Sequence, residues 1–521
     1  MTDMENLLFR PLLRPLWDLF PHLPPLLLAW DNSTLGEIAT GFTTILGPST
    51  SRNGHDQVQA AVSPALLRVV EAMAESTLGR DLATSLTRRL QSCPSVLSAN
   101  YHGVECFPEM VQALHFFALP DLLSPPAPSV TVLPVVSCGS VSLQSPTYPR
   151  GLMLSRRKAG GHVRLPFFPS SCQDLMACRA PALNPESIRA MRRQWSRSDH
   201  GLLNWEQDAV NEIMDTHVAR PEIMELRNFS QQVAPINASL CRCRYPDAPR
   251  VRVIYLEMET LAASLISDDL DNGESVMHRI LFDPAVRTRI LERLAGVRGC
   301  WKTLAVNGPA LGRTGNAGTV FFWLADERGR RCPVRLVAEG NDHPRLVYQG
   351  TSIALRPTDI QRALGAGQLI PSLFSAYVSL TLDHGLRCFG GIFLADYLPA
   401  MINGVRSACD EAQSPVPAWQ GYNPLAALPI SVQVMTEDGQ FPAGGVELMA
   451  SGGLGQDRLR AVAGLTLADV LPASLASWYE EYVPAQARPT GWETELAELA
   501  ARWQGVVVEP RPTRCRQNTA S

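Results

Sequence analysis

The residues best suited to chemistry in this sequence follow short apolar runs that predict buried β-strands. His102 comes just after the run 94–100, is followed by glycine, and has Glu105 three residues further on. A histidine near a carboxylate can act as a general base that the carboxylate orients, or as a metal ligand. The pattern predicts His102 as the base and Glu105 as its partner. The structural alternative is capping of a helix that begins near Pro108, where an acidic side chain answers the helix dipole.

A second candidate follows the β-branched run 129–136, where the sequence Ser-Cys-Gly-Ser occupies positions 137–140. Backbone N–H groups exposed after a strand suit a small anion, so we expect either a nucleophile or an anion-binding turn, with Ser140 contacting substrate. Arg150 lies a few residues later in a turn and could meet an anionic substrate. The structural alternatives are a core position for Cys138 and a surface turn for Arg150.

Two carboxylates close a third apolar run, 250–258. Glu257 and Glu259 are two residues apart, so on a strand they would share one face, where they repel unless a cation or a proton lies between them. With His278 and the aspartate-rich loop 268–273 nearby, these residues predict a divalent metal site or an acid/base pair. Turn formation alone also explains the aspartates. The sequence indicates no other cofactor.

A later loop repeats the histidine-glycine pair of the first site. His384 precedes glycine, and Arg387 follows shortly after. Two such loops could face one cleft, so we expect His384 as a catalytic residue and Arg387 as a substrate-binding residue. The alternative is the end of a helix, where histidine complements the dipole and glycine supplies the left-handed cap.

Composition narrows the class of protein. The chain has 521 residues, of which 45% are hydrophobic and 18% charged, with a net charge of −4. These values exclude a disordered chain and offer no broad basic surface for nucleic acid. The twelve cysteines show no disulfide framework, which favours reduced thiols and a cytoplasmic location. The apolar run 23–30 contains two prolines and is too short to span a bilayer, so we expect no membrane association.

The elements that must position these residues predict an α/β fold, with a mixed α+β arrangement as the alternative. We expect a partly parallel sheet with covering helices, an antiparallel hairpin near 318–337 and a helical C-terminal region. One long helix, or two joined near Gly79, should cover 63–90. The expected organisation is a proline-rich arm at 1–48, α/β units at 49–245 and 246–410, a mostly helical region at 411–508 and a disordered tail at 509–521.

In open α/β sheets, ligands bind beyond the carboxyl ends of the strands. The leading hypothesis is therefore an enzyme for group transfer or hydrolysis on a small polar metabolite, such as one of specialised metabolism, with His102 as general base in a strand-end cleft. A metal-dependent oxygenase or hydrolase using Glu257, Glu259 and histidines is the second hypothesis. The third is a non-enzymatic binding or scaffold protein, whose apolar arm could also pack on another subunit of a homo-oligomer.

Overall fold

The computed structural model describes residues 2–43, 62–98, 101–124, 130–143, 151–158, 161–197, 200–302, 318–337, 344–414, 416, 421–437 and 439–511. A parallel four-stranded sheet lies at its centre. The strand order is β12 (Arg387–Phe389), β1 (Ser95–Leu97), β2 (Thr131–Ser137) and β5 (Val251–Glu257). The predicted α/β fold with a partly parallel sheet is confirmed. β12 joins the sheet from almost 300 residues beyond β1, a pairing that the local sequence did not indicate.

Both faces of this sheet are buried, which explains why its strands are nearly continuous apolar runs. Because successive side chains of a strand point to opposite faces, each strand supplies two different cores. One core contains Leu133, Val135 and Val253. The other contains Val132, Val136 and Ile254. Because each strand is anchored in two cores, the residues that follow the carboxyl ends of the strands start from fixed positions.

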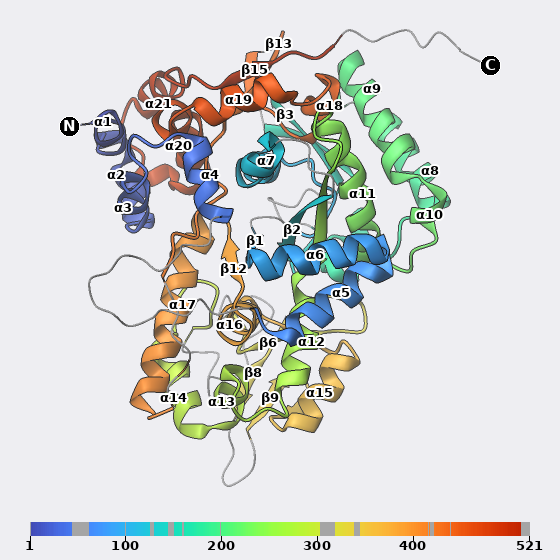
Figure 1. Ribbon diagram of the computed structural model, residues 1–521, viewed down its shortest axis with the longest axis vertical. Helices are drawn as coiled ribbons and strands as arrows, with labels where there is room; N and C mark the ends of the chain where they lie inside the picture. Colours follow the sequence, from blue (N-terminus) through green and yellow to red (C-terminus); the bar gives the residue numbers. More distant parts are fainter. Residues whose placement is uncertain are drawn as a thin grey trace.

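Helices cover the two faces. On the face of Leu133, α7 (Pro108–Leu123) and α11 (Phe229–Arg244) pack in the first core. On the other face lie α5 (Pro64–Leu78), α6 (Arg80–Ser92) and α12 (Met258–Asp269). Figure 1 shows α7 and the C-terminal helices in the upper part of the molecule and α12 to α15 in the lower part. The stretch 63–90 forms two helices divided at Gly79, which is the second of the two arrangements expected from the sequence.

Further helices build the outer parts of the molecule. The charged segment after residue 184 forms α8 (Pro185–Arg197), α9 (Asn204–Glu212), a π-helical stretch (Ile213–Val218) and α10 (Pro221–Met224). The lower part contains α13 (Val276–Phe282), α14 (Pro284–Arg293), α15 (Pro357–Gly365), α16 (Leu373–Val378), a second π-helical stretch (Ser379–Asp383) and α17 (Ile392–Glu411).

Antiparallel strands form smaller sheets around the parallel one. The predicted hairpin is confirmed in β6 (Phe322–Ala325) and β7 (Arg331–Pro333), joined by a turn in which Gly329 has φ 74°. β11 (Leu369–Pro371) pairs with the other edge of β6. The remaining strands are β8 (Arg335–Val337), β9 (Arg345–Tyr348) and β10 (Thr351–Ala354) in one sheet, with β3 (Gly151–Lys158) and β4 (Gly161–Pro166) in another.

The N-terminal arm differs from the irregular segment that its prolines suggested. Its described residues, 2–43, form the α-helices α1 (Asp3–Leu8), α2 (Arg14–Leu19), α3 (Leu23–Leu28) and α4 (Leu35–Thr43), with a 3₁₀ helix (Pro11–Leu13) before α2. Prolines occupy the first turn of α2 and α3, where the missing N–H costs nothing and the fixed φ favours the helix. The prolines therefore start these helices.

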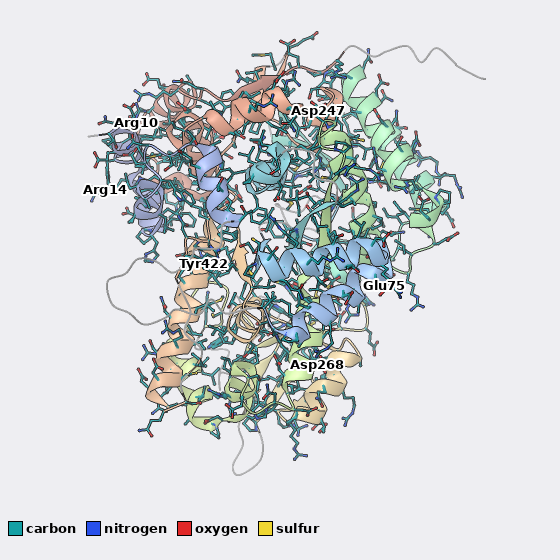
Figure 2. All side chains as sticks on the ribbon, in the orientation of Figure 1. Arg10, Arg14, Glu75, Asp247, Asp268 and Tyr422 are labelled. Carbon is teal, nitrogen blue, oxygen red and sulfur yellow. The ribbon has the colours of Figure 1, made fainter. Side chains whose placement is uncertain are left out.

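The arm packs on the body of its own chain. Phe20 is buried and lies 5.6 Å, between ring centres, from both Phe393 and Tyr482. Phe9, by contrast, is 58% exposed. Figure 2 shows the labelled Arg14 at the outer edge of the arm, where it is exposed. Much of the apolar surface of the arm is thus already covered within this chain.

The C-terminal region is helical, as predicted, with α18 (Gly445–Ala450), α19 (Gln456–Gly464), α20 (Leu467–Tyr482) and α21 (Trp492–Ala500). It also contains an unexpected sheet of β14 (Gly439–Pro442), β13 (Val432–Thr436) and β15 (Val506–Val508). Residues 512–521, most of the expected disordered tail, lie outside the described residues. Within the described part of the chain, no helix is long and apolar enough to cross a membrane.

Gly79 offers a direct test of the break between α5 and α6. Its φ of 87° and ψ of 165° fall where only glycine is comfortable, and the space around it is open. We expect Gly79→Ala to lower the free energy of unfolding, measured in urea, by about 1–3 kcal/mol. Gly41 also has open space but lies inside α4, so Gly41→Ala should stabilise the chain. Equal effects of the two substitutions would contradict this backbone argument.

Candidate active site

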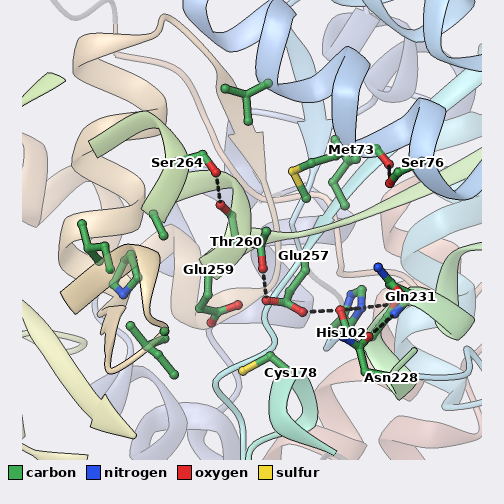
Figure 3. A pocket seen from close by; sticks show the side chains of 18 of the residues that line it. Met73, Ser76, His102, Cys178, Asn228, Gln231, Glu257, Glu259, Thr260 and Ser264 are labelled. Atoms are coloured by element: carbon green, nitrogen blue, oxygen red, sulfur yellow. Dashed lines mark hydrogen bonds between the residues drawn. The ribbon is translucent and has the colours of Figure 1, made fainter. Parts of the chain in front are cut away.

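A cavity of about 790 Å³ opens beyond the carboxyl end of β5, and His102, from the loop after β1, also lines it. Its walls come from α5, the start of α11, the first three turns of α12 and the segment 364–371. His102, Glu257 and Glu259, three residues that the sequence put forward from two different strand ends, all line it. Figure 3 shows the side chains of Glu257 and Glu259 close to Cys178, with His102 reached through hydrogen bonds. The volume lies in the range typical of small-molecule sites.

A continuous chain of hydrogen bonds leads from the sheet into this cavity. His102 Nδ1 lies 2.7 Å from Ser137 Oγ, and His102 Nε2 lies 3.0 Å from both the carbonyl oxygen and Oγ of Ser230. Ser230 Oγ in turn donates to Glu257 Oε2. The other oxygen of Glu257 accepts from Thr260 Oγ1 at 2.6 Å. The chain of hydrogen bonds that starts at Ser137 therefore ends at the Glu257 carboxylate.

The positions of the protons follow from the partners. A carbonyl oxygen only accepts, so the His102 Nε2 atom that faces the Ser230 carbonyl must carry the hydrogen. Nδ1 is then an acceptor, and Ser137 donates to it. The single hydroxyl hydrogen of Ser230 remains for Glu257. In this arrangement His102 is a donor that holds Ser230, and Glu257 is the group placed to receive the Ser230 proton.

Burial keeps His102 neutral. Its side chain is about 1% exposed, and this burial lowers the pKa of His102 to about 4, although the Ser230 carbonyl and the charge of Glu259 act in the opposite direction. An imidazole with this pKa carries no charge at neutral pH. Neutral His102 can donate from one nitrogen and accept at the other, as the hydrogen-bond chain requires.

Glu259 occupies the turn that follows β2. Its carboxylate accepts from the backbone N–H of Gly139 at 2.6 Å and of Ser140 at 2.8 Å, and Cys138 Sγ lies 3.4 Å away. The sequence predicted an anion-binding turn here, and the anion that the turn holds is the chain's own carboxylate. A Cβ on Gly139 would come within 2.8 Å of Glu257 and 2.9 Å of Cys178, so the close approach requires glycine.

Glu257 and Glu259 line the same cavity, but not because they share one face of a strand, as the sequence predicted. β5 ends at Glu257 and α12 begins at Met258, so strand alternation does not relate the two side chains. Burial raises the pKa of both carboxyl groups, and the charge of Glu257 raises the pKa of Glu259 further. The hydroxyl groups that donate to Glu257 and the N–H groups that donate to Glu259 lower these pKa values again in part.

Glu105 lies outside the hydrogen-bond chain of His102, whose two ring nitrogens are taken by serines. Its carboxylate forms a buried ion pair with Arg244 of α11 and accepts from the hydroxyl of Tyr255 on β5. Arg244 also donates to the Glu105 carbonyl, and the Glu105 N–H donates to Asn237 at 2.9 Å. Glu105 thus fastens the loop that carries His102 to α11 and β5.

His384 and Arg387 lie at the opposite end of the sheet, because both precede or begin β12. His384 is buried between Ser63, the N-cap of α5, at 2.6 Å and Asp269, the last residue of α12, at 3.0 Å. The Arg387 guanidinium stacks near Phe389 and Tyr422, each ring centre 5.2 Å away. The structure does not bring either residue to the cavity of His102.

The remaining sequence candidates are also dispersed. His278 bonds the carbonyl of Leu270 at 2.8 Å, beyond the far end of α12 from Glu257. Among the described residues, no group of three or more His, Cys, Asp or Glu side chains could hold a metal ion. Ser140 lines a smaller cavity of about 220 Å³ and accepts from Arg331 through its carbonyl at 3.2 Å. Arg150 lies outside the described residues.

Sequence reasoning missed Ser230 and Thr260. Ser230 is the second residue of α11, after the N-cap Asn228, and it meets Glu257 because α11 packs on β5. Asn228 before an apolar helical pattern is a recognisable N-cap signal. Nothing in the local sequence, however, indicates that this helix start lies at the end of β5. Thr260 follows Glu257 by one helical turn, a spacing that would have been recognised only if α12 had been predicted to start at Met258.

This fold and cavity define an α/β protein with a polar, strand-end site. No protein-family model, curated protein or solved structure matches the chain.

The ion pair between Glu105 and Arg244 generates a stability test. Arg244→Met leaves a buried carboxylate without its cation, so we expect the free energy of unfolding in urea to fall by about 3–5 kcal/mol. The double variant Arg244→Met/Glu105→Gln removes the uncompensated charge and should be more stable than the single variant. Arg460→Met, which breaks an exposed pair with Asp457, should leave stability close to that of the wild type. A double variant no more stable than Arg244→Met would contradict this account.

His102 predicts a pH dependence of stability. Its folded pKa of about 4 is below the unfolded value of 6.5, so between these values only the unfolded chain takes up the proton. The wild type should therefore lose about 2–3 kcal/mol relative to His102→Gln as the pH falls from 7 to 4.5. Urea unfolding of both proteins across this range measures the difference. A constant difference would show that His102 is not buried in its neutral form.

Proposed function

We propose that this protein is an enzyme that hydrolyses, or transfers a group from, a small polar molecule through Ser230. The observation that carries the proposal is the position of Ser230 Oγ in the cavity, in hydrogen-bond contact with both His102 and Glu257. A serine hydroxyl becomes a nucleophile when an adjacent group takes its proton and a further group orients the pair. Glu257 and His102 supply these two functions.

In the proposed first step, Ser230 Oγ attacks the acyl or phosphoryl centre of the substrate while its proton passes to Glu257. The bond to the leaving group breaks, and the leaving group takes that proton from Glu257. Water, or an acceptor hydroxyl in a transfer reaction, then attacks the serine ester and gives its proton to Glu257. As the ester bond breaks, Glu257 passes that proton to Ser230 Oγ, which restores the serine hydroxyl. The reaction needs no redox partner, and Glu257 returns to its starting state after each cycle.

The local electrostatics support Glu257 as the base. Burial raises the pKa of Glu257 above the ordinary carboxyl value, which makes it a better proton acceptor than an exposed glutamate. Ser230 lies at the second position of the 16-residue helix α11, where the helix dipole favours negative charge on an attacking or developing oxygen. His102, the base expected from the sequence, is assigned here as the positioning residue that holds Ser230.

Covalent labelling tests the nucleophile. We expect a fluorophosphonate to add once per chain at Ser230, as measured by intact mass and peptide mapping. Ser230→Ala should abolish the adduct, and Glu257→Gln should slow its formation by about 100-fold or more because the proton acceptor is lost. Ser264→Ala is the matched control, since Ser264 lines the same cavity but donates to the Thr260 carbonyl.

The alternatives give different results. Absence of any adduct, or an adduct that survives in Ser230→Ala, would refute the nucleophile. Stoichiometric metal in the purified protein, lost in Glu257→Ala, would favour the metal-dependent hypothesis instead. A pH profile of labelling separates the roles further: His102→Gln should lower the rate without moving the apparent pKa of the base, whereas Glu257→Gln should remove that pKa.

A further inference from the structure

We infer that the substrate of this cavity joins an amine, or another organic cation, to an aliphatic group. This inference rests on the proposed function for the location of the site, and it adds the chemical class of the molecule that enters. Two features of the cavity carry it. The first is the excess of acidic groups at the end where the proposed chemistry occurs, and the second is an apolar wall.

The charged groups of the cavity are unbalanced. Glu257 and Glu259 are 7% and 4% exposed, and Asp268 also lines the cavity. His102 is neutral, so Arg179 is the single cation among the described residues of the lining. Its guanidinium donates to the carbonyl of Gly367 and its charge lowers the pKa of Glu257, but one cation does not balance three carboxyl groups. An entering anion would meet a net negative wall, whereas a cation would relieve the repulsion between the buried carboxylates.

An organic cation suits the carboxylates better than a metal ion. Glu257 accepts from two hydroxyl groups and Glu259 from two backbone N–H groups, so much of their acceptor capacity is used. Among the described residues, no histidine, cysteine or acidic side chain lies close enough to the two glutamates to serve as a third metal ligand. An ammonium group has three N–H donors and no fixed coordination geometry, so it can use the acceptor sites that these two glutamates still provide.

The apolar wall indicates the rest of the molecule. Val69, Ala72 and Met73 of α5 line the cavity, together with Ala263 of α12 and the strand residues Leu369 and Ile370. These side chains offer no hydrogen bonds and gain free energy only from apolar contact. A substrate with an aliphatic part beside its amine would fill this wall and still place its cationic end by the glutamates.

Three probes of equal length test the charge preference without any turnover. n-Hexylamine is protonated at pH 7.5, n-hexanol is neutral and n-hexanoate is an anion. Ligand-observed NMR titrations of the wild type should give a Kd for hexylamine at least about tenfold below that of hexanoate, with hexanol between them. An equal or tighter Kd for hexanoate would overturn the inference.

Matched variants locate the effect. Glu259→Gln and, independently, Glu257→Gln should weaken hexylamine binding several-fold and leave the Kd of hexanol nearly unchanged. Glu274→Gln removes one negative charge at an exposed position outside the cavity and should change neither. Thermal unfolding establishes that each variant is folded. Loss of amine preference in Glu274→Gln but not in either cavity variant would refute the cavity as the site.

The same titrations separate this inference from the proposed function. Ser230→Ala retains both glutamates, so it should still prefer hexylamine even though it cannot form the covalent adduct. Amine preference without any Ser230 adduct would overturn the proposed reaction and leave the ligand class intact. A Ser230 adduct without amine preference would support the reaction and refute the ligand class.

Discussion

The hydrogen bonds from the N–H groups of Gly139 and Ser140 to the Glu259 carboxylate hold the candidate site together. They join the end of β2 to the start of α12, which follows β5, and so close the carboxyl edge of the sheet. A buried carboxylate without donors would cost several kcal/mol, so this turn has to keep its N–H groups directed at Glu259. With α12 fixed in this way, Glu257 and Thr260 face the cavity.

The second constraint is the attachment of the His102 loop. Its strand, β1, is only three residues long and cannot position the loop by itself. The buried pair of Glu105 and Arg244 ties the loop to α11, and the Tyr255 hydroxyl ties it to β5. The same helix carries Ser230 at its first turn. The ion pair therefore holds the loop of His102 against the helix that carries Ser230, although neither Glu105 nor Arg244 lines the cavity.

Sequence patterns succeeded where one element decides the outcome. The break at Gly79, the hairpin around Gly329 and the strands β1, β2 and β5 follow from local backbone preference and apolar periodicity. Placing His102, Glu257 and Glu259 after strands was sufficient to gather them, because parallel strands end at one edge of their sheet. The similar pattern at His384 led elsewhere, since that histidine precedes its strand. A residue next to a strand in the sequence can be placed at one edge of the sheet only if it is known whether the residue precedes or follows that strand.

By itself the sequence determined the class of fold, the buried strands and a group of polar residues at their ends, because these depend on local periodicity and on the type of each residue. Only the tertiary structure decided which of them work together. Ser230 contacts Glu257 because α11 packs on β5, and Arg244 forms an ion pair with Glu105, which is 139 residues away in the sequence. Hydrogen bonds and ion pairs are short-ranged, so their partners are fixed by how helices and strands pack, and no local pattern encodes that packing.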